Sequence, residues 1–145
     1  MFDAVWSRVV AGRYRAAPAR VRGYRRFAVL GESYPAVVPW ADAEVIGRVY
    51  FDVDAADLAR LDAFEGPEYR RETVEVELLE PQVDPIAPAQ LAADAPRAGA
   101  VATAGMYVFL AQGRLAPQPW DASRFGARQI ERFIADYAGG DWPAR

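Results

Sequence analysis

Apolar and polar positions follow two different periods along this chain. Residues 2–12 carry apolar side chains at helical spacing and end at a glycine, which predicts a short amphipathic helix. Residues 45–53 and 69–79 alternate with a period of two, which predicts two strands. Because residues 45–53 are apolar on both faces, we expect that strand to be central in a sheet. Asp54 then suits the N-cap of a helix over residues 55–65.

Shorter signals predict the remaining elements. These are strands at residues 21–30 and 100–110, a short extended piece at 36–38, a turn at 111–119, and a helix that begins after Asp121 and ends at Gly139. Residues 80–99 are rich in proline and alanine, which predicts a long surface excursion. The order of elements predicts a single α+β domain over residues 1–145, built on a small mixed, mostly antiparallel sheet or barrel flanked by helices.

The composition removes several kinds of chemistry. The chain of 145 residues has no cysteine and no histidine, and all 17 of its basic residues are arginine. Thiol nucleophiles, Ser-His-Asp triads, histidine metal sites and Schiff-base lysines are therefore excluded. An enzyme of this composition must transfer protons through Glu, Asp, Tyr or water. No apolar run reaches the ~18 residues of a membrane span, so we predict no membrane partner. The absence of cysteine fits a reducing cytosol, and we predict a cytoplasmic protein.

Arginine and aromatic residues are interleaved over residues 13–30, a pattern that can form a surface for single-stranded nucleic acid. The alternative is a pair of strands that carries solvated arginine on one face. The formal net charge of -3 and the lack of a recognisable nucleic-acid module favour this alternative. We therefore predict no nucleic-acid partner.

The end of the helix predicted over residues 55–65 is the most informative stretch. Gly66 suits the left-handed position after a helix and Pro67 prevents continuation, so Glu65 falls in the last turn. The helix dipole and nearby apolar groups would both raise the pKa of a carboxyl group there, as a general base near neutral pH requires. On spacing alone, an exposed glutamate at a frayed helix end is the commoner alternative, and Glu65 is a candidate only.

A distinctive set of residues surrounds this helix end. It comprises Gly47-Arg48-Val49-Tyr50-Phe51-Asp52-Val53, Leu58, Leu61-Asp62, Phe64-Glu65-Gly66, Tyr69 and Arg71. The set resembles the central signature of the gamma-glutamylcyclotransferase-like superfamily, and is most similar to its AIG2-like branch. The resemblance implies a small mixed barrel flanked by helices. It also implies an enzyme that cyclises a γ-glutamyl group to 5-oxoproline and releases an amine or amino acid, with Glu65 as general acid and base and without metal or cofactor.

Three tyrosines are candidate residues for binding the γ-glutamyl substrate. They are Tyr34, Tyr69 and Tyr107, and each is equally consistent with a plain core aromatic residue. The resemblance does not select the leaving amine. A non-catalytic binding module on the same fold is the alternative function.

The chain departs from the family pattern at its N-terminus. Members of the superfamily begin with a strand that ends in a Tyr-Gly-Thr/Ser-Leu motif, and this sequence has no such motif. We therefore expect the fold to lack its first strand, either because the sequence given starts late or because the protein is a degenerate member. In either case we expect the sequence as given to bind γ-glutamyl substrates poorly. A missing strand would leave an open sheet edge, and such an edge predicts homo-oligomerisation.

Overall fold

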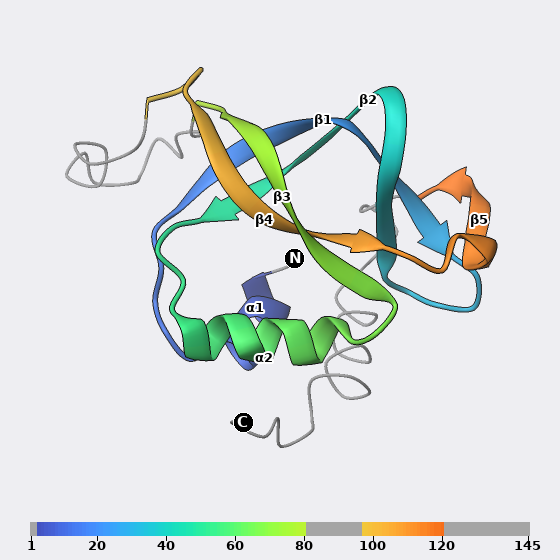
Figure 1. The fold of residues 1–145 in the computed structure, drawn as a ribbon, viewed down its shortest axis with the longest axis horizontal. Coiled ribbons are helices and arrows are strands. Elements are labelled where there is room, and N and C mark those ends of the chain that lie inside the picture. The colour runs from blue at the N-terminus through green and yellow to red at the C-terminus, as the bar shows by residue number, and fades with distance from the viewer. Residues whose placement is uncertain (1–2, 81–96, 121–145) are drawn as a thin grey trace.

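The computed structural model describes residues 3–80 and 97–120 (Figure 1). Its helices are α1 (Asp3–Val9) and α2 (Ala55–Glu65), and its strands are β1 (Ala16–Val29), β2 (Pro35–Tyr50), β3 (Tyr69–Leu78), β4 (Val101–Phe109) and β5 (Leu115–Pro119). The helix predicted over residues 55–65 is confirmed at both ends. The predicted C-terminal helix and most of the predicted surface excursion at residues 80–99 lie outside the described residues.

The strands form one antiparallel sheet in the order β2-β1-β3-β4, and β5 pairs with the end of β1. This arrangement confirms the α+β prediction, because the described strands form an open sheet with α1 and α2 packed beside it (Figure 1). β1 is long enough to pair with three strands: β2 along most of its length, β3 through Ala19 and Arg20, and β5 through Phe27 and Val29.

The prediction for β2 was wrong in two respects. First, residues 36–38 and 45–53 are not separate pieces, because one strand runs from Pro35 to Tyr50. The break in its pattern is an irregularity opposite Gly23, where the register moves from Arg22↔Glu44 to Tyr24↔Pro39. Second, β2 is not central, since it ends the path of hydrogen-bonded strands that the structure describes. One of its apolar side chains, Ile46, is 58% exposed, which explains why both faces of the strand appear apolar.

The predicted turn at residues 111–119 was also wrong. A short 3-10 helix, Gln112–Arg114, is followed at once by β5. β5 has only five residues and includes two prolines, so its sequence carries no alternating signal. It pairs with β1 at Phe27 and Val29, farther along β1 than the residues that pair with β3.

Three groups of buried side chains hold these elements together. One lies between β1 and β3 around Val21, Val76 and Leu78, and a second lies between β1, β2 and β4 around Phe27, Val38 and Phe109. The third joins the helices and consists of Val5, Val9, Val10 and Leu61, with partly buried residues that include Phe64 and Tyr107 packed against it. This third group fixes the C-terminal half of α2 against α1 and the end of β4.

Both ends of α2 are defined by local chemistry. The carboxylate of Asp54 accepts a hydrogen bond from the backbone N–H of Asp57 at 2.8 Å, as expected for an N-cap. At the other end Gly66 has a φ of 70°, the left-handed conformation that glycine adopts at no steric cost, and its N–H donates to the carbonyl oxygen of Asp62. The chain then turns directly into β3 and leaves Glu65 at the junction. None of the helices in the described ranges has the length and apolar character needed to cross a membrane.

Candidate active site

Glu65 is the last residue of α2 and is partly buried beside the third core group. Burial raises the pKa of its carboxyl group to about 7, because an anion is poorly stabilised away from water. Burial also raises the pKa of the Tyr69 and Tyr107 hydroxyls, and the charge of Glu65 adds to this at Tyr69, whereas at Tyr107 the hydrogen bond to Asp62 has a larger effect than Glu65. With a pKa of about 7, the carboxyl group of Glu65 can exchange a proton near neutral pH.

A cleft of about 510 Å³ opens next to this helix end. It is lined by Asp62, Tyr69, Arg70, Arg71, Glu72, Thr73, Thr103, Ala104, Gly105 and Tyr107. The lining comes from Asp62 of α2 and from residues of β3 and β4, and most of these residues are polar. Two of the three tyrosines expected at the site, Tyr69 and Tyr107, are among these residues.

Tyr69 and Tyr34 lie together on the sheet side of the site. Their ring centroids are 6.5 Å apart, and the ring of Tyr69 packs edge-on against Phe109 at 5.1 Å. The Tyr69 hydroxyl donates to the backbone carbonyl of Pro35 at 3.0 Å. Tyr69 therefore has a structural role as well as a place in the cleft wall. Tyr34 contacts Tyr69 and is not part of the lining of the cleft.

Tyr107 belongs to a polar network around Asp62, one turn before Glu65. Its hydroxyl donates to Oδ1 of Asp62 at 2.6 Å, and Arg71 donates to the same carboxylate from Nε at 3.0 Å and from Nη2 at 3.1 Å. Arg71 and Tyr107 are opposite each other in the β3–β4 register. The network thus joins α2, β3 and β4 at the wall of the cleft.

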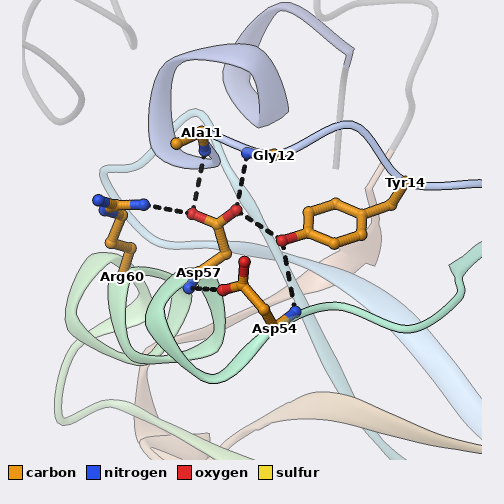
Figure 2. A network of polar contacts seen from close by, with 6 residues as sticks. All are labelled: Ala11, Gly12, Tyr14, Asp54, Asp57 and Arg60. Carbon is orange, nitrogen blue, oxygen red and sulfur yellow. Dashed lines mark hydrogen bonds and ion pairs between the residues drawn. The ribbon is translucent and has the colours of Figure 1, made fainter.

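A second network lies at the other end of α2 (Figure 2). The carboxylate of Asp57, which is 1% exposed, accepts hydrogen bonds from the backbone N–H groups of Ala11 and Gly12 at 3.0 and 2.8 Å. It also accepts from the Tyr14 hydroxyl at 2.8 Å and from Nη1 of Arg60 at 2.5 Å. Burial alone would raise the pKa of Asp57, but these hydrogen bonds to the anion hold it well below its usual range.

Sequence patterns gave no role to Asp57 or Asp62. A usable signal did exist for each, because Asp57, Leu61 and Phe64 share one helical face, which places a carboxylate on the buried stripe. Asp62 precedes Glu65 by three residues and so lies on its side of the helix. Their partners come from segments distant in sequence, and no local pattern identifies those.

The arginines of β1 are engaged within the fold. Arg20 and Arg22 both form ion pairs with Glu77, while the guanidinium of Arg25 lies over the rings of Phe27 and Trp40. Burial lowers the pKa of Arg26, which donates to the carbonyl oxygen of Ile46. These contacts agree with a structural origin for the arginine-rich pattern. Within residues 3–80 and 97–120, no cluster of three or more acidic side chains is arranged to hold a metal ion.

Comparison with known proteins identifies the family of this chain. Residues 2–122 match the family model described as gamma-glutamyl cyclotransferase, AIG2-like. The chain belongs to this family. Membership supports a function of the gamma-glutamyl cyclotransferase type at the level of the family, and it confirms the resemblance seen in residues 47–71.

Relatives of this AIG2-like chain include plant proteins. AIG2-like protein A of Arabidopsis thaliana is 45% identical over 56 residues, which are 39% of this chain and 34% of that protein. AIG2-like protein D of the same plant is 39% identical over 62 residues, which are 43% of this chain and 41% of that protein. The matched segments thus span less than half of either relative.

Solution structures of two Arabidopsis thaliana proteins share the fold. The first has a TM-score of 0.58 and 22% identity, over 96% of this chain and 78% of that protein. The second has a TM-score of 0.53 and 24% identity, over 86% of this chain and 72% of that protein. At this level of identity, the likeness establishes the fold of the AIG2-like chain and nothing about its substrate.

Proposed function

We propose that this protein cyclises a γ-glutamyl amine or γ-glutamyl amino acid to 5-oxoproline, with Glu65 as general acid and base. The observation that carries the proposal is the partly buried carboxyl group of Glu65, whose pKa burial raises to about 7. Glu65 ends the helix whose Asp62 lines a polar cleft, and it is not itself one of the lining residues. A group that must first accept and then donate a proton works best when its pKa is near the working pH.

In the proposed reaction the α-ammonium of the γ-glutamyl group gives a proton to the Glu65 carboxylate. The α-nitrogen then attacks the side-chain amide carbon, which forms the ring C–N bond. As the tetrahedral intermediate collapses, the bond from that carbon to the leaving nitrogen breaks, and Glu65 returns a proton to this nitrogen. Over the whole reaction the α-nitrogen loses two protons and the leaving nitrogen gains two. Glu65 carries the first of these protons, and the second passes from the ring nitrogen to the released amine through water, so no external acid or base is consumed.

The three tyrosines differ in their proposed roles in substrate binding. Tyr107 and Tyr69 line the cleft, so each has a surface to offer a ligand. Tyr34 does not line the cleft, and we propose that it acts on substrate binding only by supporting Tyr69, whose ring lies next to its own. Burial raises the pKa of the Tyr34 hydroxyl. The proposed partner is a small γ-glutamyl compound. We propose no role for nucleic acid, because the arginines of β1 are already paired or stacked within the protein.

The proposal is tested by measuring 5-oxoproline released from γ-glutamyl-alanine and γ-glutamyl-ethylamine by chromatography. We expect turnover by the wild type and a loss of about 100-fold or more in Glu65→Gln, the range typical of a missing general acid–base group. The matched control is Glu75→Gln, which removes an exposed carboxylate from β3 and leaves the helix end unchanged. Binding of these compounds by the wild type without product would instead indicate a binding module on the same fold, and equal activity of Glu65→Gln would remove Glu65 from the mechanism.

A further inference from the structure

One carboxylate at the cleft wall fixes two side chains from different strands. Asp62 Oδ1 accepts from both the Tyr107 hydroxyl and Nε of Arg71, and Oδ2 accepts from Nη2 of Arg71. Gly105, on β4, leaves room for this arrangement, because a Cβ there would lie 3.2 Å from Cγ and Cδ of Arg71. The Arg71 side chain therefore lies across Gly105, next to Tyr107.

The network also fixes the hydrogen-bonding direction of each group. A tyrosine hydroxyl has one proton, and that of Tyr107 is directed to Asp62, so its oxygen faces a ligand only as an acceptor. Arg71 directs one N–H from Nε and one from Nη2 to Asp62. A guanidinium has about five such donors in total, so about three are not donated to Asp62. A fixed acceptor and a fixed donor thus lie side by side.

We propose that Asp62 is a positioning residue, and that the Tyr107 oxygen and Arg71 guanidinium it holds form a subsite for an amino-acid head group of the substrate. The ammonium or amine of the head group donates to Tyr107, and its carboxylate accepts from Arg71 in the fork geometry that arginine favours. This inference rests on the proposed function, because it assigns part of the same cleft to a recognised portion of the γ-glutamyl substrate.

The charges around the cleft favour a ligand that carries both signs. Arg71 is balanced by Asp62, and the other charged pair in the lining, Arg70 and Glu72, is joined by hydrogen bonds from Nε and Nη2 of Arg70. The four charged side chains of the lining, Asp62, Arg70, Arg71 and Glu72, sum to zero, so the lining carries no net charge that would favour a simple anion. A head group with one ammonium and one carboxylate matches this balance.

An amino-acid head group has two sources in such a substrate, and the choice of substrate separates them. One is the α-amino and α-carboxylate end of the glutamyl portion, and the other is a leaving group that is itself an amino acid. γ-Glutamyl-alanine has both head groups, γ-glutamyl-ethylamine lacks the second, and 4-aminobutanoyl-alanine lacks the carboxylate of the first.

The variants are Arg71→Gln, Tyr107→Phe and Asp62→Asn, with Glu75→Gln as the control on the same face of β3. For γ-glutamyl-alanine we expect Arg71→Gln to raise KM about tenfold or more with a smaller change in kcat, as for the loss of a charge-assisted hydrogen bond. If the increase in KM disappears with γ-glutamyl-ethylamine as substrate, the subsite binds the leaving amino acid. If the increase in KM persists with γ-glutamyl-ethylamine and disappears with 4-aminobutanoyl-alanine, the subsite binds the glutamyl head group.

Asp62→Asn tests the positioning role separately. We expect it to raise KM in the wild-type background and to add little when Arg71→Gln and Tyr107→Phe are already present, because Asp62 acts through those two groups. An equal effect in both backgrounds would show that Asp62 only stabilises the fold. Unchanged KM values for Arg71→Gln and Tyr107→Phe with all three substrates would overturn the subsite.

Calorimetric binding of L-glutamate and L-alanine, with ethylamine and propionate as single-charge controls, keeps the subsite testable without turnover. An inactive wild type that binds an amino acid, and loses this binding in Arg71→Gln but not in Glu75→Gln, would refute the proposed reaction and support the subsite. An active wild type whose amino-acid binding and KM are unchanged by Arg71→Gln would support the proposed reaction and refute the subsite.

Discussion

Each end of α2 carries a buried or partly buried carboxyl group, and the surroundings shift the two pKa values in opposite directions. Asp57, near the N-terminal end, is almost fully buried and receives hydrogen bonds from two backbone N–H groups, Tyr14 and Arg60 (Figure 2). Glu65, at the C-terminal end, is partly buried, and its burial raises its pKa to about 7. Burial alone would raise the pKa of both groups, yet only that of Glu65 is raised, because the hydrogen bonds to Asp57 hold its pKa well below the usual range.

The difference teaches how one helix can supply both an anchor and a proton carrier. The helix dipole has its positive end near Asp57 and its negative end near Glu65, so it adds to the contrast. A carboxylate held by several donors stays ionised and ties distant segments together, whereas a desolvated carboxyl group changes protonation near neutral pH. The anchor holds residues 11–14 against α2, and the same helix ends at Glu65.

The largest expected effect is a difference in the free energy of unfolding between variants of Asp57 and of Glu65. We expect Asp57→Asn to lower the free energy of unfolding by about 3 kcal/mol or more, since an amide cannot accept from all the donors that surround Asp57. Glu65→Gln at pH 8 should leave stability unchanged or increase it, because the variant removes an ionised group that is costly to bury. Urea denaturation at pH 8 measures both.

The control for this comparison is Asp52→Asn, whose carboxylate is 85% exposed and forms a 3.4 Å ion pair with Arg15. We expect it to change stability by less than about 1 kcal/mol, as for other exposed pairs. A loss of stability in Glu65→Gln as large as that in Asp57→Asn would show that both groups are structural anchors and would remove the contrast.

A smaller effect is the pH dependence of stability, which should have opposite signs for the two groups. The pKa of Glu65 is raised from 4.5 to about 7 on folding, so its contribution is present below pH 4.5 and is lost as the pH rises to 7. The loss is on the order of 3 kcal/mol. Asp57, whose folded pKa is lowered, contributes stability above its unfolded pKa of 3.8 and loses it as the pH falls below that value.

Urea unfolding at pH 3, 5 and 8 tests these signs. The difference between the wild type and Glu65→Gln should grow between pH 5 and 8, and the difference between the wild type and Asp57→Asn should shrink between pH 5 and 3. If the Glu65→Gln difference is the same at pH 5 and pH 8, the carboxyl group of Glu65 does not titrate in this interval and is a poor candidate for a general base.

The same contrast shows which features the sequence could predict. The bounds of α2, the cap at Asp54 and the stop at Gly66 follow from residues adjacent in sequence, and the structure has all three. The position of Glu65 at a helix end next to apolar residues follows from the same local signals. The partners of Asp57 lie about 45 residues away, and those of Asp62 belong to β3 and β4. Such contacts depend on the register and packing of the whole sheet, which no local pattern contains.

The errors in the sheet have a similar origin. A long irregular strand such as β2 loses its period of two where residues bulge, so its sequence predicts two separate pieces. Its apolar residues suggested a central strand, although an end strand with an exposed Ile46 has the same pattern. β5 was missed because prolines interrupt a strand of five residues.

The smallest expected effect concerns the glycine that gives Tyr14 access to Asp57. A Cβ on Gly12 would lie 2.6 Å from the Tyr14 hydroxyl oxygen, which donates to Asp57 and accepts from the backbone N–H of Asp54. Gly12→Ala should therefore displace the tyrosine and lower the free energy of unfolding by about 1 to 3 kcal/mol, the usual cost of overpacking. The control is Gly47→Ala, which has nothing within 4 Å of the added carbon and should cost little.

Combining Gly12→Ala with Asp57→Asn decides whether the cost comes from this contact. If the added methyl group acts by breaking the bond between Tyr14 and Asp57, its cost should be smaller once Asp57 is already changed, because interacting sites are not additive. Fully additive losses would mean that Gly12 is constrained by its own backbone and not by the anchor. Because the anchor lies at the opposite end of α2 from Glu65, we also expect Gly12→Ala to keep Glu65 at a pKa near 7, which the pH dependence of 5-oxoproline release would report.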